Sequence, residues 1–181
     1  VEAPGKTQSS NPTLRGYLPA VELAAGDRFP NFMLPDQSGA TRSFLERAKG
    51  NPLLVLGDGR DETLRTLEAL RKERPEADCL ALVGEEPEAA ARRAEALGIA
   101  FPLLADSKGK IREALRRMLG AGPQGSFLIL LDANQRVLAA RAGLDGGELL
   151  RWAAEQLNAL PPSPPAQSFG MAAPVLIVPN E

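Results

Sequence analysis

Short apolar runs alternate with helical patterns through the middle of the chain. The run LLVL at 53–56 is continuously apolar, which is typical of a strand buried on both faces of a sheet. CLALV at 79–83 and FPLLAD at 101–106 predict two further strands, and an amphipathic helical pattern follows each of the three. This repetition of strand and helix predicts an α/β fold built on a central sheet.

The three helices that follow these strands have recognisable ends. The first carries leucines at helical spacing, and either Asp58 or Asp61 is able to cap its start. The second has Pro87 at its start and Gly98 just past its end, an arrangement that helix termini favour. The third lies within SKGKIREALRRMLG at 107–120, whose apolar residues share one face.

Hairpin patterns flank the alternating part on both sides. In the stretch 29–44, apolar residues lie on both sides of a turn at 36–39, which predicts two short strands, and a short helix is expected near 45–49. In SFLILLDANQRVLAARAG at 126–143, two apolar runs are separated by a turn, which is typical of an antiparallel hairpin. The central sheet is therefore expected to be mixed.

The last helical pattern has a well-defined start and is followed by a change of composition. Asp145 precedes Glu148 by three residues, which is the spacing of a capping box. The segments before and after the periodic part are rich in proline and polar residues and lack a regular pattern. We divide the chain into a flexible N-terminal arm at 1–20, a folded domain at 21–160, a Pro-rich linker at 161–171 and an extended tail at 172–181.

Composition and charge exclude several kinds of chemistry. The chain has 181 residues and a formal charge of −2, and its basic and acidic residues alternate, so we expect no nucleic-acid and no membrane partner. It has no histidine, which removes Ser-His-Asp and Cys-His catalysis and His-containing metal sites. We expect no metal and no cofactor in this fragment. The single cysteine, Cys79, cannot form an internal disulfide, and a cytoplasmic location is the default.

Two stretches of the sequence resemble a known family. AGDRFPNFMLPDQSGATRSFLE at 25–46 is similar to the opening motif GDxAPxFxLPDxxGxxxxLxD of the alkyl hydroperoxide reductase/thiol-specific antioxidant family, the peroxiredoxins. SFLILLDANQRVLAARAG is similar to that family's F-x-I-D-x-x-G-x-V hairpin. The resemblance covers about residues 20 to 160. It implies a thioredoxin-like α/β fold, with a central mixed sheet flanked by helices and a peroxiredoxin-type N-terminal hairpin.

The same resemblance implies that the family's reactive site has been lost. In peroxiredoxins the peroxide-reactive cysteine lies at the start of the first long helix, and in this chain Thr63 falls at or near that position. A threonine hydroxyl is not ionised at neutral pH and cannot be oxidised as a thiolate is. The family's supporting arginine on the later hairpin corresponds to Leu138, with Arg136 and Arg141 out of register. The site is therefore expected to be degenerate, with no catalytic residue.

The turn GDGRDET at 57–63 has the position of an active site, between a strand and a helix, but lacks the spacing of a phosphate-binding loop. Its acidic residues would also repel a phosphate at the helix start. We expect a remnant pocket there, formed by five residues: Asp58, Arg60, Thr63, Gln124 and Gly125.

Cys79 has two interpretations. It opens the predicted strand at 79–83, away from any predicted helix start, and buried unpaired cysteines usually behave as small apolar groups. The alternative is that Cys79 is a reactive thiol, either of a thiol-dependent peroxidase or oxidoreductase or of a redox sensor. A reactive thiol would have a depressed pKa and would be alkylated rapidly in the native protein.

The expected function is a non-catalytic interaction or positioning module of a larger redox or oxygenase protein. The tail PPSPPAQSFGMAAPVLIVPNE at 161–181 is similar to the linker and first strand of fusions in which a redoxin domain precedes an iron(II)/2-oxoglutarate oxygenase domain. The expected partner is thus another protein or a following domain of the same chain. A homodimer is a further possibility, since peroxiredoxin relatives dimerise through sheet edges or active-site loops.

Overall fold

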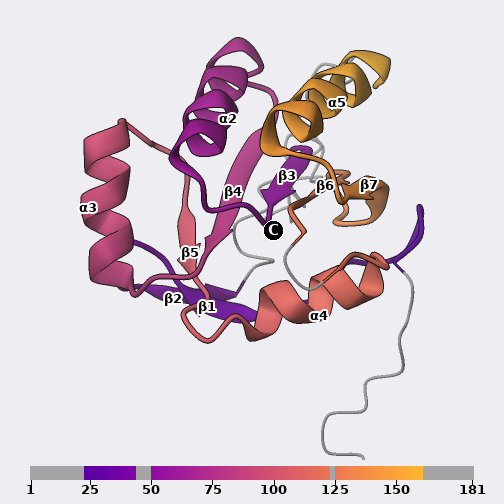
Figure 1. The fold of residues 1–181 in the computed structure, drawn as a ribbon. Coiled ribbons are helices and arrows are strands. Elements are labelled where there is room, and N and C mark those ends of the chain that lie inside the picture. Colours follow the sequence, from indigo (N-terminus) through magenta and orange to yellow (C-terminus); the bar gives the residue numbers. More distant parts are fainter. Residues whose placement is uncertain (1–22, 44–49, 123–124, 161–181) are drawn as a thin grey trace, which may run out of the picture.

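The computed structural model describes residues 23–43, 50–122 and 125–160, which form a mixed sheet with helices on both faces and a separate small hairpin (Figure 1). The strand order of the sheet is β5-β4-β3-β6-β7, and the hairpin pairs β1 with β2. The elements are β1 (Met33–Pro35), β2 (Thr41–Ser43), β3 (Leu53–Leu56), α2 (Asp61–Glu73), β4 (Asp78–Val83), α3 (Pro87–Leu97), β5 (Leu103–Ala105), α4 (Lys110–Met118), β6 (Phe127–Leu131), β7 (Val137–Ala142) and α5 (Gly146–Ala159). The predicted fold class is confirmed. The helix expected near 45–49 lies outside the described residues.

The direction of the strands decides which loops meet. β3 runs parallel to β4 and antiparallel to β6, and β7 runs antiparallel to β6. All four residues of β3 are buried, as its continuous apolar run predicts. The carboxyl ends of β3 and β4, the start of β6 and the end of β7 therefore lie at one end of the sheet. We call it the Gly57 end, after the residue that follows β3.

Alternate residues of the strands pack into two separate cores. On one face, Leu54, Leu56 and their neighbours pack against the apolar sides of α2, α3 and α5. On the other face, Leu53 and Val55 pack with residues of α4 and with the segment that contains Phe29. Because side chains alternate between the faces of a strand, a fully apolar strand supplies both cores.

The hairpin of β1 and β2 lies beside the outer edge of β5. The Gln37 side chain donates to the carbonyl oxygen of Phe101 at 3.2 Å and accepts from the amide of Leu103 at 2.8 Å. Asp36 also forms a bridge with Leu104. These contacts pair backbone groups that an edge strand would otherwise expose, which protects the edge from pairing with another chain.

The predicted start and end of α3 are confirmed, whereas the predicted cap of α2 is not. Pro87 is the first residue of α3. Gly98 ends α3 with a left-handed φ of 68°. The prediction that Asp58 or Asp61 caps α2 is wrong: the N-cap residue is Arg60, and no side chain caps the helix. Asp61 is already helical, and the Asp58 carboxylate instead accepts from the backbone amide of Arg60 at 2.9 Å.

The capping box of α5 is confirmed and gives a testable expectation. The Asp145 carboxylate accepts from the amide of Glu148 at 2.8 Å, and the Glu148 carboxylate accepts from the amide of Asp145 at 3.4 Å. Replacing Asp145 by alanine removes the shorter bond, and we expect a loss of about 1 kcal/mol in the free energy of unfolding, measured in urea. The matched control, Glu148→Gln, keeps an acceptor and should change stability little. An equal loss in both variants would contradict this account.

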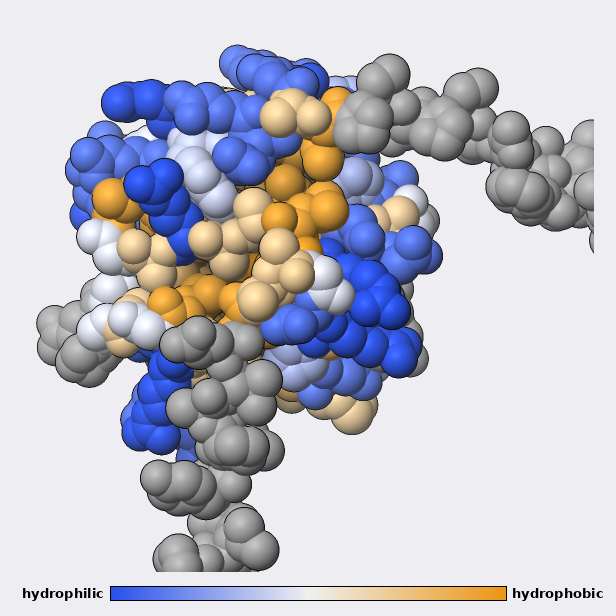
Figure 2. Space-filling model, turned by 90° about the vertical axis from the view of Figure 1, so that its right-hand side faces the viewer, coloured by the Kyte–Doolittle hydropathy of each residue, from blue (hydrophilic) through white to orange (hydrophobic). Residues whose placement is uncertain are grey.

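A groove lined mainly by apolar residues lies on the side of the molecule that carries β7 and α5, where Figure 2 shows apolar side chains reaching the surface. The groove has a volume of about 590 Å³. Its lining includes Leu23, Met118, Val137, Ala140 and Trp152. Trp152 is only partly buried and packs against the core that α5 covers.

Candidate functional site

The candidate site lies at the Gly57 end of the sheet, where the chain leaves β3 and enters α2. Gly57 donates its amide to the carbonyl oxygen of Phe127 at 2.9 Å, so that the backbone lies close against β6. A Cβ atom at position 57 would overlap the ring of Phe127. Glycine is therefore required at the point where the turn begins.

Asp58 is the buried centre of this turn, with 6% of its surface exposed. Its carboxylate accepts from the Arg60 guanidinium at 2.8 Å and from the Thr63 hydroxyl at 3.1 Å. Burial opposes the negative charge of Asp58, but the hydrogen bonds from Arg60 and Thr63 outweigh it and hold the pKa of this carboxyl below its ordinary value. Asp58 is therefore a carboxylate in the folded protein, and it fixes the conformation of the turn.

Thr63 lies in the first turn of α2 and is buried, with 4% of its surface exposed. Gly146, the first residue of α5, packs directly against it, because a Cβ atom at Gly146 would overlap the Thr63 hydroxyl and methyl groups. The starts of α2 and α5 therefore converge at Thr63. A small cavity of about 210 Å³ lies beside them, lined by Thr63, Arg60 and Asp145 among others.

A larger pocket of about 460 Å³ shares Arg60 and Asp145 with this cavity. Three of the five residues predicted for the remnant pocket line it: Asp58, Arg60 and Gly125. Thr63 lines the smaller cavity instead. Gln124 lies outside the described residues. We call the larger space the arginine pocket, since Arg112 and Arg116 also line it.

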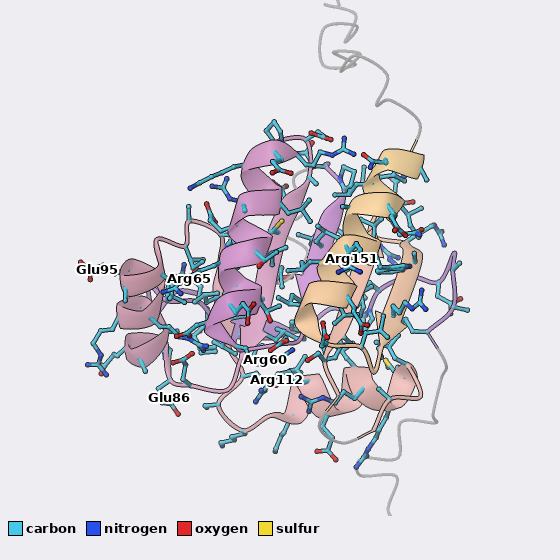
Figure 3. The ribbon with its side chains drawn as sticks, turned by 45° about the horizontal axis from the view of Figure 1, so that its top comes forward. Arg60, Arg65, Glu86, Glu95, Arg112 and Arg151 are labelled. Carbon is cyan, nitrogen blue, oxygen red and sulfur yellow. The ribbon has the colours of Figure 1, made fainter. Side chains whose placement is uncertain are left out.

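Sequence reasoning missed the two arginines of α4. Figure 3 shows Arg60 and Arg112 in the space between the starts of α2 and α5 and helix α4. Arg112 pairs with the Asp106 carboxylate at 3.4 Å, and Gly84 leaves room for it, because a Cβ atom there would lie 2.8 Å from the guanidinium. Arg116 donates from Nε to the carbonyl oxygen of Gly125 at 2.8 Å. The spacing of Arg112 and Arg116 by four residues places them on one face of the helix. The sequence does not show that this face lies beside the turn after β3.

Solved structures with the same architecture come from thiol-redox proteins. The structure of the peroxidoxin BcpB from Mycobacterium tuberculosis matches with a TM-score of 0.68 and 21% identity, over 78% of this chain and 100% of that one. A thiol peroxidase from Chromobacterium violaceum matches with a TM-score of 0.58 and 18% identity, over 75% of this chain and 89% of that one. A putative thiol:disulfide interchange protein DsbE from Chlorobium tepidum matches with a TM-score of 0.61 and 19% identity, over 77% of this chain and 100% of that one. The sequence matches no family model and no curated protein.

The chain has a peroxiredoxin-like thioredoxin fold. Within this fold, the expectation that Leu138 takes the place of the supporting arginine is wrong. Leu138 follows Val137, which pairs with Leu131, and Leu131 in turn pairs with Leu53 at the start of β3. Leu138 therefore lies at the opposite end of the sheet from the candidate site, with 37% of its surface exposed. The hairpin motif alone gave no information about which end of β7 faces the site.

Cys79 is not among the residues that line the candidate site. It is near the start of β4, opposite Leu54 of the parallel strand β3, whereas the site is at the carboxyl ends of these strands. The side chain is buried in the core that α2 and α5 cover, with 4% of its surface exposed. Burial raises the pKa of the Cys79 thiol to about 12.

The described residues include no group of three or more histidine, cysteine, aspartate or glutamate residues placed to hold a metal ion. The helices in this part of the chain are too short or too polar to cross a membrane.

Proposed function

We propose that this peroxiredoxin-like domain is a degenerate, non-catalytic module that binds or positions a partner within a larger redox or oxygenase protein. The observation that carries the proposal is the state of Thr63. Its hydroxyl donates to the ionised Asp58 carboxylate in the first turn of α2, where the family's chemistry would need a thiolate. A carboxylate at this distance favours a hydrogen-bond donor and disfavours a second negative charge.

The partner in this proposal is another protein or a following domain of the same chain, such as an iron(II)/2-oxoglutarate oxygenase domain, and a homodimer is an open alternative. The domain acts in the cytoplasm and uses no cofactor of its own. The rival function, a peroxidase or redox sensor that uses Cys79, receives little support, because the thiol is buried and its pKa is raised to about 12. A thiol with so high a pKa is protonated at neutral pH and is a poor nucleophile.

The test is a peroxide-consumption assay of the full chain, with either dithiothreitol or thioredoxin as the reductant. We expect no turnover above a protein-free blank, and the same result for Cys79→Ala, which removes the thiol without burying a new polar group. We also expect Cys79 to react with iodoacetamide only after unfolding in guanidinium, since a buried, protonated thiol is a poor nucleophile. Turnover that disappears in Cys79→Ala, together with rapid alkylation of the native protein, would replace this proposal with the rival one.

A further inference from the structure

The arginine pocket contains one guanidinium group without an acidic partner. Arg60 pairs with Asp58 at 2.8 Å, and Arg112 pairs with Asp106 at 3.4 Å. Arg116, the third arginine of the pocket, forms no ion pair with any described residue. Of the three arginines of the pocket, Arg116 is therefore the one that the described residues leave without a paired carboxylate.

Arg116 is held in place although it has no counter-charge. It is partly buried, and its Nε donates to the carbonyl oxygen of Gly125, which lines the same pocket. Its two terminal amino groups form no hydrogen bond with a described residue. Burial and the like charge of Arg112 lower the pKa of Arg116. Both effects are unfavourable for the cation, and a bound anion would offset them.

The acidic groups around the pocket limit the charge that a ligand can carry. Asp58 and Asp106 are paired with arginines, and Glu113 of α4 pairs with Arg117. The other acid of the lining, Asp145, accepts from the amide of Glu148. The hydrogen bond to Asp58 is the main cause that raises the pKa of Arg60, and the negative charge of Asp145 adds to it. A single negative charge would balance Arg116. Asp145 repels any anion in the pocket, and it repels a dianion such as phosphate more strongly than a carboxylate.

We propose that the arginine pocket binds a small carboxylate, with the guanidinium of Arg116 as its principal partner. A planar guanidinium offers two parallel donors that match the two oxygens of a carboxylate. The pocket volume of about 460 Å³ falls in the range of small-molecule sites. Gly57, Gly59, Gly125 and Gly143 form much of its wall, which leaves space beside the guanidinium. This inference extends the proposed function, because it names the ligand chemistry of the same site.

The test is an NMR titration of the full ¹⁵N-labelled chain with sodium acetate, at constant ionic strength maintained with sodium chloride. We expect saturable shifts of the amides of Gly125 and Gly143 and of the Arg116 Nε resonance. Acetamide, which has the same shape without the charge, should produce none of these shifts. Shifts that are absent with acetate, or equal with acetamide, would overturn the proposal.

Variants of α4 test the role of Arg116 directly. We expect Arg116→Gln to weaken acetate binding at least tenfold, and the matched control Arg117→Gln on the exposed side of the same helix to leave it unchanged. Arg116→Lys keeps the charge but loses the planar fork, so we expect it to bind acetate with intermediate affinity. This variant tests the role of Arg116 even if Arg116→Gln folds poorly. Equal affinity in Arg116→Gln and the wild-type chain would refute the assignment.

Two probes distinguish the possible sources of the carboxylate. N-acetyl-triglycine with a free carboxyl end and the same peptide as its amide are titrated in the same way. If the free acid binds more tightly than acetate and the amide does not bind, the source is the end of a protein chain. If the free acid binds no better than acetate, the source is a free small acid. The peroxide assay does not depend on these shifts, so the two proposals fail separately.

Discussion

Replacement of Gly57 by alanine is expected to lower the free energy of unfolding by about 3 kcal/mol. The added methyl group would overlap the ring of Phe127, which is fully buried in the core beneath the site. The Gly57 amide is also fixed by its hydrogen bond to the carbonyl oxygen of Phe127, so the backbone cannot move away without losing that bond. Urea unfolding of the full chain measures the change.

Gly59→Ala is the matched control for this substitution. It lies in the same turn, but the nearest atom to a Cβ there is a nitrogen of the Arg93 side chain at 3.7 Å, an ordinary contact distance. We expect a change within about 0.5 kcal/mol. A second variant, Phe127→Leu in the Gly57→Ala protein, should recover part of the loss, because it makes room for the methyl group. Equal destabilisation by the two alanines would mean that the turn tolerates no side chain at all, whatever the contact with Phe127.

The sequence specified the elements of the fold better than their contacts. The apolar run of β3 predicts a strand covered on both faces, and it is the middle strand of the sheet, between β4 and β6. The spacing of Asp145 and Glu148 predicts the capping box that starts α5. These signals are local, since each depends on residues within a few positions of one another. The family resemblance, rather than periodicity, supplied the thioredoxin-like arrangement of these elements.

Features that depend on contacts between distant segments could not be predicted from local sequence patterns. Glu68 is a charged residue in α2, yet only 5% of its surface is exposed, because its carboxylate accepts from Arg71 and from the backbone amide of Ala100. The amphipathic pattern of α2 does not contain Ala100 and so cannot predict this burial. The contact between Arg116 and Gly125 is a comparable case, because it depends on where α4 lies relative to the loop before β6.

The candidate site was predicted in part for the same reason. Asp58, Arg60 and Thr63 are close in sequence, and the structure joins them through the Asp58 carboxylate. The register of β7, by contrast, depends on its pairing with β6, which includes an irregularity between Leu130 and Leu131. A motif comparison cannot place Leu138 without that pairing. The sequence therefore indicated which residues of the turn lie together, but it predicted neither the uncapped start of α2 nor the residues that approach the turn from other elements.

The substitution Thr63→Cys is expected to give a thiol that is alkylated slowly unless the Asp58 carboxylate is removed as well. The start of α2 favours a thiolate, since the first amides of a helix and its dipole stabilise negative charge. The Asp58 carboxylate acts in the opposite direction, because it lies 3.1 Å from the present Thr63 hydroxyl and is ionised. Burial of position 63 disfavours the thiolate further.

We therefore expect Thr63→Cys/Asp58→Asn to react with iodoacetamide at pH 7 at least tenfold faster than Thr63→Cys alone, both in a Cys79→Ala background that leaves one thiol. One unit of pKa changes the thiolate fraction tenfold while the thiol pKa lies above the ambient pH. The asparagine retains the shape of the aspartate and frees the charge of Arg60, which also favours the thiolate. The pH dependence of the alkylation rate should shift to lower pH in the double variant.

Glu62→Gln in the Thr63→Cys background is the matched control, because it removes a negative charge from the same helical turn at an exposed position. An exposed charge is screened by solvent, so this change should raise the rate much less than Asp58→Asn does. If both changes accelerate alkylation equally, the field of the whole turn, and not the contact with Asp58, controls the chemistry at position 63. If neither does, burial by Gly146 and its neighbours, and not the Asp58 carboxylate, controls the reactivity of a thiol at position 63.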